Sequence, residues 1–229
     1  MSTFTQLALI FSFVGLLIIL SYMKGGKKKK IIFFGDSITE QATVRGGFIT
    51  QIEAIIKSDV AHTDYQLVAA GISGNTVTDL RFRLDRDVLN KEPYATIVYI
   101  GTNDVWHNEN AGEAKYTTSF EDGYRHIIRE LLRHNSKVVL CTPAVIGEQW
   151  NGYNKQDKEL DLYAGIIRKL SLEYSLQLVD LRKTFTDYYT TANLENLPSG
   201  ILTHDGVHLN SQGNILVADA IWNVLKQVK

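Results

Sequence analysis

Three short segments far apart in the chain carry the side-chain types that an acyl-transfer site needs. Ser37 ends a Gly-Asp-Ser sequence, Asn103 lies in Gly-Thr-Asn-Asp, and Asp205 and His208 bound Asp-Gly-Val-His. A serine hydroxyl becomes a nucleophile when an imidazole takes its proton, and a carboxylate beside the imidazole fixes its tautomer. We therefore predict a triad of Ser37, His208 and Asp205. Because Asp205 precedes His208 by three residues, we expect a helical turn to place the carboxylate beside the ring.

A fourth segment, residues 71–76, supplies a glycine turn in which a backbone donor could lie. An acyl-transfer site needs such donors in place before the substrate oxygen becomes negative. We expect the backbone N–H groups of Ser37 and Gly74 and the side-chain amide of Asn103 to form this oxyanion hole. Gly71 is the alternative to Gly74 as the second backbone donor.

The elements that must position these residues alternate along the chain after residue 26. Short runs rich in β-branched and aromatic residues are followed by amphipathic helices, which predicts an α/β fold with a doubly wound parallel sheet. We expect five strands, at residues 31–34, 66–70, 96–100, 137–141 and 177–179. We expect helices at 47–57, 76–89, 119–134 and 157–174, and a last one from a cap at Ser211 to 226. In helix 76–89, the arginine–aspartate pairs are expected on the solvent side.

The crevice of an open parallel sheet lies beyond the carboxyl ends of its strands. The segments at 35–37, 71–76 and 101–104 follow predicted strands, and the segment at 205–208 leads into the last helix. The pattern therefore predicts that all four meet at one edge of the sheet.

In combination and order, the four segments resemble those of the SGNH (GDSL) hydrolase family, over residues 31–226. The resemblance implies a flavodoxin-like three-layer α/β/α sandwich with a five-stranded parallel sheet, no metal and no cofactor. It also implies Ser37 as nucleophile, Gly74 and Asn103 as oxyanion donors, and Asp205 and His208 as the remaining triad. Residues 35–40 are similar to those of branches that act on short acyl esters.

The predicted function is a serine esterase that hydrolyses carboxylic esters of short acyl or acetyl groups through an acyl-enzyme. One alternative is a thioesterase or lysophospholipase with a longer acyl preference. Others are an acyltransferase to a sugar hydroxyl and a non-catalytic binding module on the same fold. The chain has no Gly-x-Ser-x-Gly sequence, which disfavours the common α/β-hydrolase fold.

The first thirty residues differ from the rest. Residues 4–22 form a run of 19 without a charge, close to the roughly 20 needed to span a bilayer, and five lysines follow within 24–30. We predict an uncleaved signal or transmembrane anchor at 1–23, a Lys/Gly-rich linker at 24–30 and a catalytic domain at 31–229. A cleaved signal and a buried helix are the alternatives. The lysines after the span favour a cytoplasmic domain, and an extracytoplasmic one stays open.

The charge and the cysteine content of the chain limit which classes of partner and metal site are expected. Residues 31–229 hold 19 basic and 25 acidic side chains, which argues against a nucleic-acid partner. The lysines at 24–30 suit the headgroups of anionic lipid. The single Cys141, in an apolar run, is expected to be buried, and no histidine or acidic group has metal-ligand spacing. The oligomeric state stays open. Because the predicted first strand starts near the bilayer, Ser37 should lie roughly 17 Å further out, which favours a soluble small-molecule ester, such as an acetylated sugar.

Overall fold

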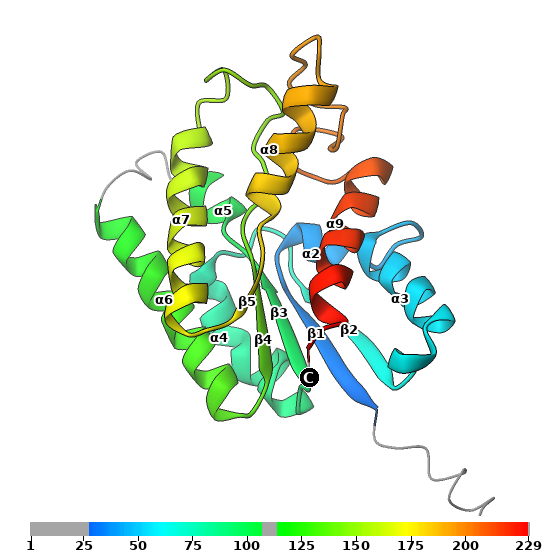
Figure 1. The fold of residues 1–229 in the computed structure, drawn as a ribbon. Coiled ribbons are helices and arrows are strands. Elements are labelled where there is room, and N and C mark those ends of the chain that lie inside the picture. Colours follow the sequence, from blue (N-terminus) through cyan, green and yellow to red (C-terminus); the bar gives the residue numbers. More distant parts are fainter. Residues whose placement is uncertain (1–27, 107–113, 229) are drawn as a thin grey trace, which may run out of the picture.

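Five parallel strands form the centre of the molecule, in the order β2-β1-β3-β4-β5 (Figure 1). The computed structural model describes residues 28–106 and 114–228. The strands are β1 Lys29–Gly35, β2 Tyr65–Gly71, β3 Ala95–Tyr99, β4 Lys137–Cys141 and β5 Gln177–Val179. This strand order is that of flavodoxin-like sheets, so the predicted class and strand number are confirmed.

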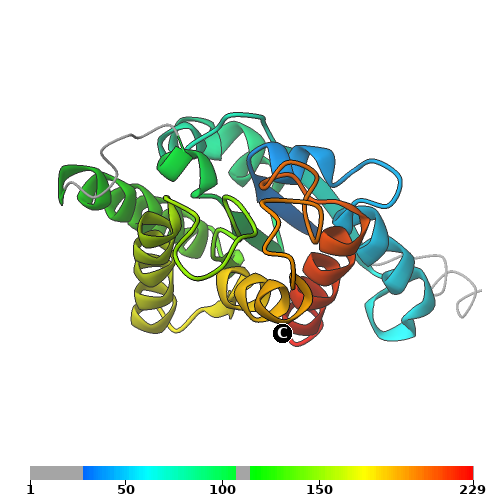
Figure 2. The ribbon, with the colours of Figure 1, turned by 90° about the horizontal axis from the view of Figure 1, so that it is seen from above.

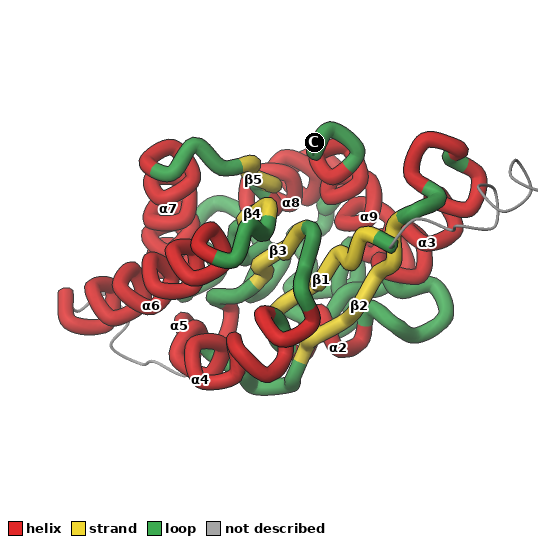
Figure 3. The backbone as a smooth tube through the Cα atoms, turned by 90° about the horizontal axis from the view of Figure 1, so that it is seen from below, coloured by secondary structure: helices red, strands yellow, loops and turns green. Residues whose placement is uncertain are grey.

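Helices cover both faces of the sheet, which gives the three layers seen in Figures 2 and 3. Helices α3, α8 and α9 pack on one face, and α4, α6 and α7 pack on the other. The helices are α2 Ser37–Gln41, α3 Phe48–Ser58, α4 Val77–Asp87, α5 Thr102–Trp106, α6 Ala114–Arg133, α7 Asp157–Glu173, α8 Leu181–Ala192 and α9 Ser211–Leu225. Two short 3₁₀ turns, η1 Val60–His62 and η2 Leu89–Lys91, precede β2 and β3.

Strand β1 is apolar from Ile31 to Phe34 because both faces of the sheet are covered there. Ile31 and Phe33 join the core beneath α3 and α9, whereas Ile32 and Phe34 join the core beneath α4 and α6. All four side chains are buried. Successive residues of a strand point to opposite faces, so one apolar run fills two cores and fixes the register of the sheet.

The helices depart from the sequence prediction in several places, and the two short helices α2 and α5 were not predicted. Helix α8 was not predicted, because its sequence is rich in threonine and aromatic residues that favour strands. Helix α6 begins at Ala114, five residues before the predicted start. The cap of α9 is Asn210, whose side chain accepts from the Gly213 N–H, and Ser211 is the first helical residue. The prediction of Ser211 as the cap was therefore wrong by one position.

The predicted membrane anchor lies outside the described residues. Within 28–106 and 114–228, no helix combines the length and apolarity needed to cross a bilayer. β1 begins at Lys29, so the last two residues of the predicted linker belong to the sheet.

Candidate active site

The nucleophile candidate stands at a sharp turn between the central strand and the helix that follows it. Ser37 is the first residue of α2, directly after β1. The Asp36 carboxylate accepts from the Ile38 N–H at 3.0 Å and so caps α2. Gly35 has no room for a side chain, because a Cβ there would overlap Thr39 and the Tyr99 carbonyl. The turn therefore presents the Ser37 hydroxyl at the carboxyl edge of the sheet.

The three predicted triad residues lie in one chain of hydrogen bonds. Ser37 Oγ is 3.0 Å from His208 Nε2, and His208 Nδ1 is 2.7 Å from Asp205 Oδ2. Asp205 Oδ1 also accepts from the backbone N–H groups of Val207 and His208, at 2.9 and 2.7 Å. The segment is a loop with no helical turn, so that expectation was wrong. The Asp205 carboxylate instead lies beside the ring because its other oxygen is held by the backbone N–H groups of the two residues named above.

The charge state of Asp205 suits the orientation of His208. Burial favours the neutral acid, but the hydrogen bonds from the imidazole and the two backbone N–H groups outweigh it and hold the pKa of Asp205 at about 2. An ionised carboxylate accepts a hydrogen bond from Nδ1–H, so the ring proton stays on Nδ1 and Nε2 is free to accept the hydroxyl proton of Ser37. The pair therefore has the arrangement of an oriented general base.

The loop after β2 carries Gly74 in a backbone conformation that favours glycine, with a φ of 77°. The side chain of Glu40 on α2 holds this loop, because it accepts from both the backbone N–H and the hydroxyl of Ser73. Gly71 lies at the end of β2, where a Cβ would overlap the Glu40 backbone N. A Cβ at Gly74 would meet nothing within 4 Å. The two glycines therefore differ in surroundings: Gly71 packs against α2, and Gly74 lies beside open space.

Asn103 comes from the turn after β3 and is buried at the start of α5. Its side-chain nitrogen donates to the Asn75 carbonyl at 3.0 Å. An amide nitrogen carries two hydrogens, so a second donor stays available for a substrate oxygen. The next residue, Asp104, accepts from the Val77 N–H at 3.1 Å, which ties α5 to the start of α4. Burial raises the pKa of Asp104 to about 7.

A buried guanidinium joins these segments beneath the site. Arg83 donates to the carbonyls of Gly35 and Ala70 at 2.6 and 2.9 Å, and to the side chain of Asn75 at 2.7 Å. It also pairs with Asp87 at 2.9 Å. The expectation that the arginines of this helix face solvent was wrong for Arg83, which is 6% exposed. No sequence signal separates it from the exposed arginines beside it.

A second support holds the loop that carries Asp205 and His208. The buried Glu148 carboxylate accepts from the backbone N–H groups of Ile201 and Leu202, at 2.7 and 2.6 Å. The Gly147 N–H donates to the Gly206 carbonyl at 2.8 Å. The segment that follows β4 is therefore hydrogen-bonded at several points to the loop that carries Asp205 and His208.

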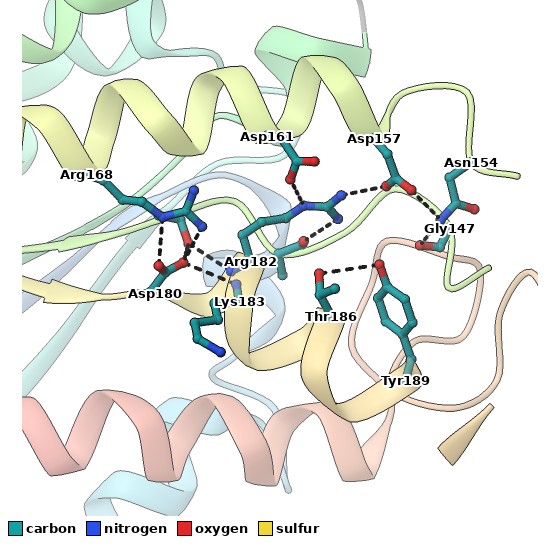
Figure 4. Close-up of polar contacts among 12 residues, drawn as sticks. Gly147, Asn154, Asp157, Asp161, Arg168, Asp180, Arg182, Lys183, Thr186 and Tyr189 are labelled. Atoms are coloured by element: carbon teal, nitrogen blue, oxygen red, sulfur yellow. Dashed lines mark hydrogen bonds and ion pairs between the residues drawn. The ribbon is translucent and has the colours of Figure 1, made fainter. Parts of the chain in front are cut away.

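The loop after β4 is fixed in turn by the cluster in Figure 4. Arg182 on α8 is buried and pairs with Asp157 and Asp161 of α7, each at 2.7 Å. The side chain of Asn154 donates to the Gly147 carbonyl at 3.2 Å and to Asp157 at 3.3 Å. This network, like Glu148, was not foreseen, because nothing in a loop sequence marks which charge becomes buried.

A hollow of about 190 Å³ opens next to the segments that carry Ser37 and His208. Its walls include Ile38 and Leu209, the neighbours in sequence of Ser37 and His208, together with Arg45, His204 and Asn210. None of its lining residues is acidic. The hollow offers polar and basic groups next to the site.

Several known proteins are similar to this chain in sequence and in fold. It is 27% identical to an acetylxylan esterase of Geobacillus stearothermophilus, over 86% of this chain and 94% of that one. It is 25% identical to an uncharacterized lipoprotein, YqeF, of Bacillus subtilis (strain 168), over 90% of this chain and 93% of the relative. The crystal structure of an acetyl xylan esterase, AlAXEase, matches with a TM-score of 0.80 and 44% identity, over 85% of this chain and 98% of that one.

Structures of the Geobacillus enzyme include catalytic mutants in which a serine, an aspartate or a histidine is replaced by alanine. The replaced aspartate and histidine stand three positions apart in that enzyme, the same spacing as Asp205 and His208. The model of the GDSL-like lipase/acylhydrolase family matches residues 33–215, which include all four segments of the site. The chain therefore belongs to the GDSL-like lipase/acylhydrolase family and is a carboxylic ester hydrolase.

Proposed function

We propose that this esterase removes acetyl groups from the hydroxyls of short xylan-type oligosaccharides, with Ser37 as nucleophile. The observation that carries the proposal is the continuous hydrogen-bond chain from Ser37 through His208 to Asp205. Two of the relatives are named acetylxylan esterases, and they align with nearly the whole described chain. The polar hollow beside the site suits a sugar better than an acyl tail.

The reaction follows from the positions of the side chains. Ser37 Oγ attacks the acetyl carbonyl carbon while its proton passes to His208 Nε2, and Asp205 stabilises the imidazolium. The carbonyl oxygen becomes negative and accepts from the N–H groups of Ser37 and Gly74 and from the amide of Asn103. His208 then gives its proton to the departing sugar oxygen, which leaves acetyl on Ser37. Water, deprotonated by His208, attacks the acetyl group and releases acetate.

The assignment of Gly74 over Gly71 as the second backbone donor is part of this proposal. Gly74 lies in the loop beside open space, whereas Gly71 lies within a strand and packs against α2. Glu40 and Arg83 support the Gly74 loop from two sides, through Ser73 and Asn75. Donors fixed in this way need no rearrangement as charge develops.

A substrate series with full-length protein in detergent tests the proposal. We expect turnover of p-nitrophenyl esters to be highest with acetate and to fall towards palmitate. Acetate release from acetylated xylo-oligosaccharides should be efficient, and Ser37→Ala should abolish both. A maximum at long chains would favour the thioesterase or lysophospholipase alternative. Transfer of acetyl to a sugar acceptor in preference to water would favour the acyltransferase.

We further propose that residues 1–23 attach the enzyme to a membrane as a single span. The uncharged run at 4–22 and the lysines after it support this attachment. Extraction of cell membranes with alkaline carbonate tests the attachment, since an integral span stays with the lipid and a peripheral protein is released. Protease accessibility in intact cells tests the side, which the lysines favour as cytoplasmic.

A further inference from the structure

Lysines collect at the end of the sheet opposite the catalytic loops. Because the five strands are parallel, all of them begin at this end, and the chain enters the sheet here at β1 (Figure 1). We call six lysines the basic face: Lys28, Lys29, Lys30, Lys57, Lys91 and Lys137. They come from β1, the end of α3, η2 and the start of β4.

Backbone contacts bring these elements together. The Tyr94 N–H donates to the Lys30 carbonyl at 2.9 Å, and the Tyr94 carbonyl accepts from the Lys137 N–H at 2.9 Å. The Lys30 ammonium donates to the Lys91 carbonyl at 2.9 Å. Tyr94 therefore links β1 to β4, and the Lys30 side chain links β1 to η2.

The remaining members border the same region. Lys28 and Lys57 line one hollow, and Lys28, Lys29 and Lys30 line a second hollow with Tyr94. The basic face is therefore continuous from the end of α3 to the start of β4.

Positive charge on this face is only partly neutralised. Lys29 pairs with Asp64 at 3.0 Å. The other five lysines of the basic face make no ion pair with any residue of 28–106 or 114–228. The other acids at this end are Glu53, Asp59, which pairs with His62, and Glu92. The surplus is basic although residues 31–229 carry 25 acidic and only 19 basic side chains.

We propose that the basic face docks on an anionic lipid bilayer. The uncharged run at 4–22 precedes Lys28 by only five residues, and Lys24 and Lys27 lie between them. A lysine close to an anionic leaflet contributes about 1 kcal/mol, so several together set the orientation of the domain. The catalytic loops then lie at the far end of the seven-residue β1, about 20 Å from the lipid surface. This inference goes beyond the ester chemistry and does not depend on it.

The test uses the full chain in vesicles of neutral lipid alone or of neutral and anionic phosphatidylglycerol lipid. A fluorophore is attached at Ser58→Cys, next to Lys57, or at Tyr153→Cys in the loop after β4. The native Cys141 is buried, and burial raises the pKa of its thiol, so it does not compete for the label. A quencher on the lipid headgroup then reports which end of the domain faces the bilayer.

We expect the label at Ser58 to be quenched severalfold more than the label at Tyr153 in anionic vesicles. The difference should shrink in neutral vesicles and in about 0.5 M salt, where charges are screened within a few ångströms. Equal quenching at the two sites, quenching that ignores lipid charge, or no association with anionic vesicles would overturn the proposal.

Matched charge reversals complete the test. The Lys57→Glu/Lys137→Glu variant should lose the difference between the two labels, whereas Lys155→Glu/Lys158→Glu, with the same change of charge, should keep it. Loss in both variants, or in neither, would contradict docking through this face. All variants should hydrolyse p-nitrophenyl acetate at the wild-type rate, which shows that they are folded. Absence of esterase activity alongside the expected quenching would count against the proposed function and leave the docking intact.

Discussion

At the scale of single residues, the orientation of the proposed general base, His208, depends on the two carboxylate oxygens of Asp205, which accept hydrogen bonds from different groups. One oxygen accepts from the imidazole of His208, and the other accepts from two backbone N–H groups of its own loop. The same contacts fix the position of the carboxylate and keep it ionised. The residue types and their spacing of three predict that Asp205 pairs with His208. The loop conformation that brings the two side chains together is seen only in the structure.

Replacement of Asp205 by asparagine should remove this control without unfolding the loop. The asparagine oxygen still accepts from the Val207 N–H, but its amide cannot keep His208 Nε2 free of a proton. We expect kcat on p-nitrophenyl acetate to fall by on the order of 10³–10⁴, with little change in KM. Asp219→Asn, at an exposed position on α9, is the matched control and should be silent. A kcat within tenfold of wild type for the Asp205 variant would contradict its role.

At the scale of elements, the candidate active site is built from loops, and neighbouring loops and helices fix the positions of these loops. The segment after β4 is bonded along the segment that carries Asp205, and Glu148 contributes a buried carboxylate to that pairing. The loop after β2 is held by α2 and by Arg83 on α4. Catalytic geometry therefore depends on residues that never touch a substrate.

Glu148→Gln tests the first of these supports. A glutamine directs its NH₂ group at one of the two backbone N–H groups, which leaves a buried donor unpaired at about 2–3 kcal/mol. We expect a lower melting temperature, and a kcat reduced by roughly 10²-fold because the base moves relative to Ser37. Glu195→Gln, at an exposed position nearby, should change neither. Wild-type kcat in a destabilised Glu148 variant would show that the loop keeps its shape without the carboxylate.

The two glycines after β2 should respond differently to alanine. Gly71→Ala places a methyl group on the backbone of α2, so we expect it to fold poorly. Gly74→Ala has room, and its left-handed backbone costs about 1–2 kcal/mol, so it should fold. Relief of that backbone strain would shift the N–H of residue 74. If this N–H is an oxyanion donor, kcat should therefore fall by up to 10²–10³-fold. Full activity in a folded Gly74→Ala protein would redirect the assignment to another donor.

At the scale of the whole molecule, the central sheet was predictable because β1, β3 and β4 carry apolar runs and because β1, β2 and β3 are each ended by a glycine turn. The approach of Ser37, His208 and Asp205 was predictable because each stands in a short segment with a specific combination of residue types, and the roles of these residues and of Asn103 stay predictions. Helix α8 was not, since its threonines and aromatic residues contradict local propensity and tertiary packing of Phe185 decides the outcome. Arg83 and Glu148 were not, because burial of a charge depends on partners that are distant in sequence.

The pH dependence of stability should report a carboxylate buried at the centre of the fold. Burial raises the pKa of Asp36 to about 6, against about 3.9 in an unfolded chain. Its contribution is therefore complete below pH 4 and is lost as the pH rises through 6. Asp36→Asn does not titrate, so between pH 4 and 7.5 the wild type should lose about 3 kcal/mol relative to the variant. Denaturant unfolding at the two pH values measures this, with exposed Asp85→Asn as control. A pH-independent difference would contradict a neutral Asp36.

The last described residue lies beside the first strand. The Val228 carbonyl accepts from the hydroxyls of Tyr94 and Tyr65, at 3.3 and 3.5 Å, and the Lys29 ammonium lies 5.0 and 5.6 Å from the centres of the same two rings. The described chain thus starts and finishes at one place, at the end of the sheet remote from α2 (Figure 1). A carrier protein or solid support joined to the carboxyl terminus would therefore lie away from the loops that carry Ser37 and His208, so the enzyme lends itself to immobilisation from that terminus.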